Sequence, residues 1–335
     1  MNYLLSILFV FLFAFSAYGK DTSKGIGGGN LRLIDISLDA LLAGGASTEE
    51  DEILQNLQGG GHDPRKRGFT VQNVELSLSG AIDPYLTGES HIIYFLDPLS
   101  GETVVELEEA FLTTLSLPHR LQLEAGHFFT EFGRINLRHP HAWHWQDQPV
   151  INTRLFGPDG MRGPGFRLGW LLPLSWFSEL HFGAQNANGE TMVSFLANEE
   201  FFDERAIGNR PFADRGVKTL KDLVYLLRLD NALDLSDEVT AKLGLYTQLL
   251  YGFKPGWAAG LRYEYATGSG GGRESDPFRD DRNRVSPLAT WMPTEFSRFR
   301  AKYNYDRADH LPDREAHSVW LGAEFLYGAH AAHSF

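Results

Sequence analysis

The chain has 335 residues, no cysteine, and 43 acidic against 30 basic residues, which gives a formal net charge of -13. The absence of cysteine excludes disulfides and thiolate metal sites, and the acidic balance argues against nucleic acid as a partner. Aromatic residues make up 13% of the chain, and its apolar residues are spread over alternate positions instead of long runs, which is typical of a membrane β-barrel.

The N-terminal residues 1–19 resemble a secretory signal peptide. An apolar run from Leu4 to Ala17 is followed by Ala17-Tyr18-Gly19, a small-x-small cleavage site before Lys20. The run is shorter than the ~20 residues of a membrane-spanning helix, so an uncleaved anchor is the weaker alternative. We therefore expect export, followed by a single domain over residues 20–335 without a transmembrane helix.

The remaining chain alternates between apolar and polar residues in thirteen stretches, each of which predicts a half-buried β-strand. A bacterial barrel closes with an even number of strands, so we expect about 12–14, with residues 191–196 as a candidate for a hidden strand. Long polar stretches, such as residues 44–68 and 267–284, are expected to be extracellular loops. The predicted strands are residues 34–40, 74–79, 85–96, 105–116, 121–129, 166–172, 176–184, 223–229, 239–250, 257–265, 285–291, 296–305 and 319–327.

This pattern predicts an all-β fold, namely a porin-like transmembrane antiparallel β-barrel in the cell outer membrane. Aromatic residues such as Tyr85, Trp176 and Trp257 lie near predicted strand ends, where interfacial girdles occur. An exported β-sandwich or propeller is the alternative, since its strands would alternate too. One residue breaks the pattern, because Glu109 falls on the apolar face of its predicted strand.

The segment after residues 121–129 is rich in histidine and suggests a metal site. In an extended chain, His139 and His141 would project to the same side with Cα atoms ~7 Å apart, and both could reach one Zn²⁺. His144 has the opposite parity and would join them only after a turn. The alternative is a set of ordinary loop histidines. The tail pair, His330 and His333, is a second candidate.

Strand parity also predicts the residues that line the pore. Arg and Lys at the lipid midplane would cost ~2–4 kcal/mol each, so charged residues should face inward. We expect an acidic and a basic ladder facing each other across the lumen, unless each charge is neutralised by an adjacent strand. The acidic ladder is Glu106, Glu108 and Glu124, and the basic ladder is Arg298, Arg300 and Lys302.

Several motifs resemble those of the zinc-regulated TonB-dependent outer-membrane receptor family, and more distantly those of phosphate-selective porins of the O and P type. The resemblance implies an outer-membrane barrel of a Gram-negative envelope that is linked to zinc supply. A TonB-gated receptor resembles a 22-stranded barrel with a plug domain, for which the segment before the first strand leaves no room. The motifs are Val105–Phe111, Gly126–Phe129 with Phe132-Gly133, His139–Trp143, Glu295–Arg298 and His330–Phe335.

The expected function is therefore a channel for small hydrophilic solutes, with a link to zinc or metal-complex uptake. The alternative is an outer-membrane receptor or adhesin that binds a ligand without open conduction. No nucleophile with a neighbouring base has a recognisable signature, so we expect no enzyme activity. No cofactor is expected apart from zinc, and the expected partners are outer-membrane lipid, small solutes or metal ions, and the barrel assembly machinery.

Overall fold

The computed structural model describes residues 34–97, 100–189, 191–192, 216–232, 242–243, 246–266 and 281–328. The expected signal peptide, residues 1–19, lies outside this part, as do the tail residues His330 and His333, so both expectations stay predictions.

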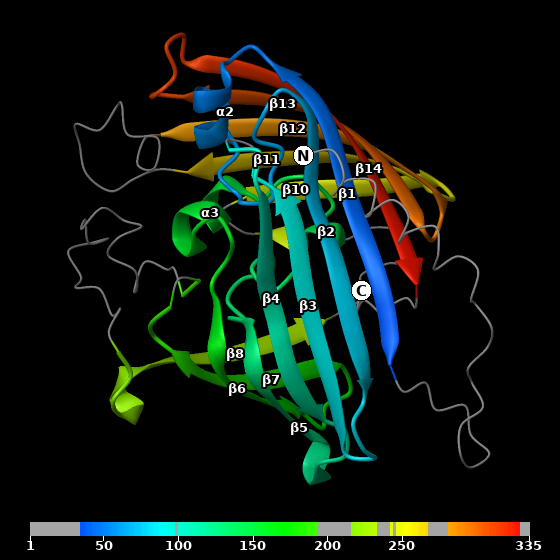
Figure 1. Ribbon diagram of the computed structural model, residues 1–335, viewed down its shortest axis with the longest axis vertical. Coiled ribbons are helices and arrows are strands. Elements are labelled where there is room, and N and C mark those ends of the chain that lie inside the picture. The colour runs from blue at the N-terminus through cyan, green and yellow to red at the C-terminus, as the bar shows by residue number, and fades with distance from the viewer. Residues whose placement is uncertain are drawn as a thin grey trace, which may run out of the picture.

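The described strands form one antiparallel sheet of 14 strands in the order β8-β7-β6-β5-β4-β3-β2-β1-β14-β13-β12-β11-β10-β9. The sheet curls around a central space, with β1–β4 facing the viewer in Figure 1 and β10–β14 bending away behind them. The strands are β1 (Asp35–Ser47), β2 (Gly68–Ala81), β3 (Leu86–Leu96), β4 (Thr103–Thr114), β5 (Leu121–Phe129), β6 (Arg162–Leu171), β7 (Phe177–Asn186), β8 (Leu223–Ala232), β9 (Lys242–Leu243), β10 (Tyr246–Lys254), β11 (Trp257–Ala266), β12 (Arg282–Thr294), β13 (Ser297–Ala308) and β14 (Glu315–Gly328).

The helical elements are short and lie in the connections between strands. Two of the 3₁₀ turns, η2 and η3, begin with proline, whose fixed φ suits a first helical position. None of the helices among the described residues has the length and apolar character needed to cross a membrane. The helices are α2 (Asp51–Leu57), α3 (Val150–Phe156), η2 (Pro118–Arg120), η3 (Pro140–Ala142) and η5 (Leu220–Asp222).

Each of the thirteen predicted stretches coincides with strand, but one of them, residues 239–250, contains two strands instead of one. Leu243 pairs with Thr247 and Lys242 with Gln248, so β9 folds back on β10. The sequence pattern alone did not reveal this pairing. Of the suspected hidden strand at 191–196, only Thr191 and Met192 are described, and neither is in a strand.

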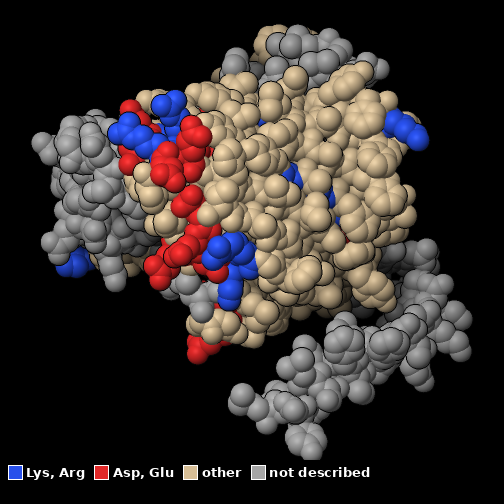
Figure 2. Space-filling model, turned by 90° about the horizontal axis from the view of Figure 1, so that it is seen from above, with Lys and Arg blue, Asp and Glu red and all other residues tan. Residues whose placement is uncertain are grey.

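The sheet is apolar outside and polar inside, the reverse of a water-soluble protein. Leu227, Leu321 and Tyr327 are more than half exposed, whereas Arg284 and Lys302 are almost completely buried. Figure 2 shows a face with a wide area of few charged side chains, while acidic and basic residues gather toward one side. An exposed apolar band around a charged interior matches an outer-membrane barrel, so the predicted fold class is confirmed.

The exception at Glu109 is explained by a β-bulge. His91 of β3 pairs with Glu109, but the next residue, Ile92, pairs with Leu107, so Glu108 is an extra residue in β4. A bulge of this kind places two consecutive side chains on nearly the same side of a strand. Glu108 and Glu109 are both buried as a result.

The sheet also joins the two ends of the described chain. β1 pairs with β2 on one edge and with β14 on the other, in a register that runs from Ser37 opposite Gly328 to Ser47 opposite Ser318. All the other neighbouring pairs among the described strands are consecutive in sequence. The β1–β14 seam is therefore the pairing with by far the longest separation in sequence.

Candidate functional site: an inner loop held between two charged walls

The connection between β5 and β6, residues 130–161 and here called the inner loop, turns inward. Its α3 lies within the curve of the sheet (Figure 1). Its middle, residues 145–150, is buried throughout, with Trp145 only 1% exposed. A surface loop would be wet along such a stretch, so this loop occupies the lumen and narrows it.

This buried stretch is bound to strands β11–β13 through Asp147. The carboxylate of Asp147 lies 2.7 Å from the guanidinium of Arg262, 2.8 Å from that of Arg284 and 2.7 Å from Nζ of Lys302. Burial disfavours the charge of Asp147, but these three cations outweigh it and hold the pKa of Asp147 well below its usual range. The carboxylate therefore stays ionised and anchors the loop.

Main-chain groups add to this anchor. The indole Nε1 of Trp145 donates to the carbonyl of Ser286 at 3.1 Å, and Arg300 donates to the carbonyl of Trp143 at 3.1 Å. These bonds satisfy buried polar groups of a loop that has no strand partner of its own.

Two glycines in the barrel wall make room for the loop. A Cβ on Gly260 of β11 would lie 3.1 Å from the Trp145 ring, and a Cβ on Gly322 of β14 would overlap the side chain of Gln146. Any larger residue at 322 would therefore push against the buried loop.

We expect Gly322→Val to displace the inner loop without unfolding the barrel. Overpacking of this kind costs about 1–3 kcal/mol. Trypsin should then cleave after Arg134 and Arg138 about tenfold faster, since 1.4 kcal/mol is a factor of ten. Gly183→Val is the matched control, because the nearest atom to its new Cβ is 3.8 Å away on Leu226. Equal cleavage of both variants would contradict the close-fit interpretation.

An earlier part of the loop, residues 139–141, reaches an acidic wall formed by β2, β3 and β4. Glu75 lies at the centre: its Oε1 is 2.8 Å from Nδ1 of His91 and 3.4 Å from Nδ1 of His139, and its Oε2 is 2.8 Å from Nδ1 of His141. His139 in turn contacts Glu108 through Nδ1 at 2.6 Å and Glu109 through Nε2 at 2.7 Å. We call the following residues the histidine–carboxylate cluster: Glu75, Glu89, His91, Glu108, Glu109, His139 and His141.

The charge on His139 is favoured by its surroundings. Burial lowers its pKa, but the carboxylates of Glu108 and Glu75 outweigh burial and raise the pKa of His139 well above its ordinary value. In the absence of any other cation, His139 is therefore protonated and forms ion pairs with this wall.

The predicted metal trio is only partly brought together. The segment is not extended, since Pro140–Ala142 form η3, yet the rings of His139 and His141 stack with centroids 5.5 Å apart. His144 instead lines a separate pocket on the side of the loop that faces Arg262. Sequence reasoning missed Glu75 and His91, which come from distant strands with no local signature.

The six predicted pore-lining residues point inward, but each has a partner. Arg298 and Arg300 contact Glu324 on the adjacent β14, and Lys302 contacts Asp147 of the inner loop. The two ladders therefore do not face each other across open water. The three residues of the acidic ladder are paired as well: Glu106 with Arg162, Glu108 with His139, and Glu124 with Arg167 at 2.6 Å.

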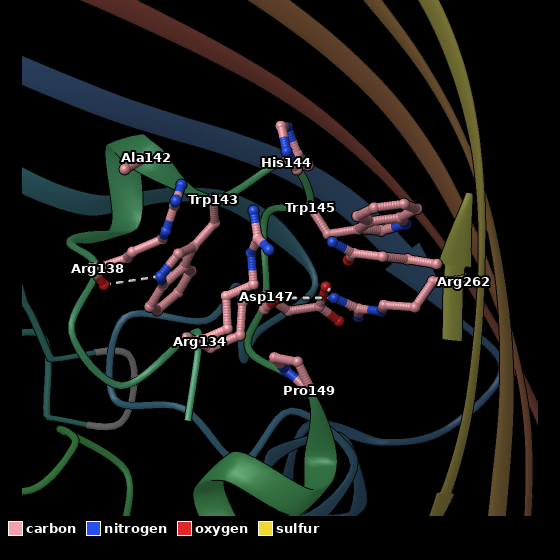
Figure 3. A pocket seen from close by; sticks show the side chains of 11 residues that line it. Arg134, Arg138, Ala142, Trp143, His144, Trp145, Asp147, Pro149 and Arg262 are labelled. Carbon is pink, nitrogen blue, oxygen red and sulfur yellow. Dashed lines mark hydrogen bonds and ion pairs between the residues drawn. The ribbon is translucent and has the colours of Figure 1, made fainter. Parts of the chain in front are cut away.

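A pocket on the other side of the inner loop is lined by basic and aromatic residues (Figure 3). Arg134, Arg138 and Trp143 come from the loop, and Arg262 reaches it from β11. Arg134 is exposed and, within the described part of the chain, its side chain makes no hydrogen bond or ion pair. Among the described residues, this pocket therefore holds a positive charge without an ion-pair partner beside two indole rings.

The lipid-facing apolar band, the charged lumen and the inward loop together define a porin-like barrel of the outer membrane. No family model matches the chain. An uncharacterized protein of Aquifex aeolicus is 26% identical over 353 aligned positions, which cover 82% of this chain and 73% of that protein.

Solved structures with a similar trace include three outer-membrane proteins, which cover 88% of this chain. The outer membrane channel DcaP of Acinetobacter baumannii has 12% identity over 98% of its length and a TM-score of 0.48. The outer membrane protein OpdK of Pseudomonas aeruginosa has 9% identity over 99% and a TM-score of 0.47. An anion-selective porin from Comamonas acidovorans has 6% identity over 99% and a TM-score of 0.45.

Proposed function

We propose that the protein is an outer-membrane channel through which small hydrophilic solutes diffuse past the inner loop. The observation that carries this proposal is the lumen itself: buried charged side chains line the wall, and a loop that is fixed at His139 and at Asp147 narrows the passage. Such a lining suits polar solutes and water, whereas a ligand-closed barrel has no need of a charged wall along its length.

The alternative is a receptor or adhesin that binds a ligand without conduction. Planar-bilayer recordings of the refolded chain separate the two possibilities. A channel gives stable stepwise currents, and the absence of steps at every voltage, with a correctly folded barrel, would exclude the channel. The lack of enzyme activity stays a prediction from sequence.

We expect Arg134→Gln to shift the reversal potential in a salt gradient toward cations. Arg134 lines the pocket and has no ion-pair partner in the part of the chain that the structure describes, and removing an exposed charge should change stability by no more than about 0.5 kcal/mol. Lys254→Gln is the control, since Lys254 is an exposed residue at the end of β10 and does not line the pocket. Identical reversal potentials for both variants and the parent would place the permeation path elsewhere.

The expected link to zinc or metal-complex uptake is part of the proposal, and so is delivery by the barrel assembly machinery. Metal uptake would require metal ions to pass the inner loop, where the imidazoles of His139 and His141 meet the carboxylates of the barrel wall. Uptake of ⁶⁵Zn²⁺ into liposomes that contain the refolded protein, compared with uptake of a neutral sugar, tests whether metal is favoured.

A further inference from the structure

The histidine–carboxylate cluster differs from the rest of the lumen in how its charges are compensated. Two other inward-facing carboxylates are paired with arginine, since Glu106 contacts Arg162 and Glu124 contacts Arg167. Within the described residues, none of the four cluster carboxylates, Glu75, Glu89, Glu108 and Glu109, forms an ion pair with Lys or Arg, and the ion-pair partners of all four are histidines. Histidine, unlike arginine, can also be a metal ligand when neutral.

The geometry of the cluster suits a metal ion. Potential ligand atoms of Glu75, His91 and His139 all lie within 4.8 Å of one another. Around a tetrahedral zinc ion with bonds of 2.0–2.1 Å, neighbouring ligand atoms are separated by about 3.3 Å. The separations of 2.8 Å between Glu75 and His91 and 3.4 Å between Glu75 and His139 are close to that value.

We propose that Glu75, His91 and His139 bind a divalent transition metal ion such as Zn²⁺, which fastens the inner loop to the barrel wall. Glu108 lies beside this trio, since its Oε2 is 2.6 Å from Nδ1 of His139 and the residue is 1% exposed. Two imidazoles and one carboxylate form a donor set that zinc and its neighbours in the first transition series accept, with a fourth position left for water.

Two remaining residues would orient the ligands. Glu89 contacts Nε2 of His91 at 2.9 Å, and Glu109 contacts Nε2 of His139 at 2.7 Å. A carboxylate on the far nitrogen of a ligating histidine is a common feature of zinc sites, since it fixes the ring and its tautomer. This arrangement leaves Nδ1 of both histidines to the ion.

The proposal goes beyond the channel function because the ion is a bound structural ion that links loop and wall, and not the transported solute. Its three ligands come from β2, β3 and the inner loop, so binding would couple loop and wall. A second group of potential ligands is less suitable, because Arg162 already forms an ion pair with Glu106. This group is His62, Glu106 and Asp159.

The test uses the full refolded chain, stripped with chelator, and Zn²⁺ in titration calorimetry. Glu75→Gln, His91→Ala and His139→Ala should each lower Zn²⁺ affinity about tenfold or more, a typical effect of damaging a metal site. His144→Ala is the matched control: it lies in the same loop but in the other pocket, and its affinity should equal that of the parent. Zn²⁺ should also slow tryptic cleavage after Arg138 in the parent and in His144→Ala only.

Three results would overturn the proposal: no Zn²⁺ binding by the folded parent, unchanged affinity in all three ligand variants, or an equal loss in His144→Ala. Co²⁺ absorption spectra of the parent provide a measurement that needs no variant, because tetrahedral coordination gives intense visible bands. Spectra of an aqueous octahedral ion alone would also exclude the site. Bilayer conductance, recorded in chelator, tests the channel separately, so either idea can fail alone.

Discussion

Replacement of Asp147 by asparagine is expected to release the inner loop from the lumen. Three buried cations contact this carboxylate, and Lys302 has no other acidic partner in the described residues. Breaking a buried ion pair by removing one partner costs about 3–5 kcal/mol. Single-channel conductance should rise, and tryptic cleavage after Arg134 and Arg138 should accelerate about a hundredfold or more.

Two further variants test the cause of this effect. Lys302→Met in the Asp147→Asn background should restore much of the loop's protection, because it removes the stranded cation. Asp51→Asn is the matched control, since Asp51 forms a surface pair with Arg67 at 2.9 Å that is worth no more than about 1 kcal/mol. Unchanged conductance and cleavage in Asp147→Asn would mean that other contacts hold the loop.

The second large effect concerns ion selectivity. A triple variant in which Gln replaces Arg298, Arg300 and Lys302 should shift the reversal potential in a salt gradient toward cations. The reason is that Glu324 loses both of its arginine partners. Gln at Glu106, Glu108 and Glu124 should shift it toward anions. An uncompensated charge acting at 4 Å in water is worth about 1 kcal/mol, or roughly a fivefold change in permeability ratio.

The partners that the structure reveals sharpen this experiment. Glu324→Gln added to the basic triple should return the reversal potential toward the parent value, since it removes the stranded carboxylate. If neither triple changes selectivity while both variants fold and conduct, the paired ladders do not contribute to the permeation path.

The strands could be predicted from sequence because a two-residue period records which face meets lipid. Leu227 and Leu229, for example, are followed by Arg228 and Asp230, so apolar and polar side chains fall on opposite faces whatever their partners are. The β9–β10 reversal and the bulge at Glu108 could not be predicted, since neither disturbs composition. A bulge shifts parity by one residue, and in the sequence Glu109 therefore looks like an exception.

Only some residues of the candidate site could be predicted from the sequence, and the reason is different. His139 and His141 are conspicuous because they are close along the chain. Glu75 and His91 become their neighbours only when β2, β3 and the inner loop meet, and a single sequence does not record that meeting. The direction of the loop was equally hidden, because a charged residue such as Asp147 reads as a surface residue until three cations surround it.

The seam between β1 and β14 has a consequence for the order of folding. Every other neighbouring pair of described strands is consecutive in sequence and can form as soon as the next strand is available, as in a hairpin. β1 must wait for β14, almost the whole chain later, while its edge groups stay unpaired. An unpaired strand edge is unstable in hydrocarbon and prone to pair with other chains. The edge of β1 that faces β14 therefore stays unpaired until the last of the described strands is in place.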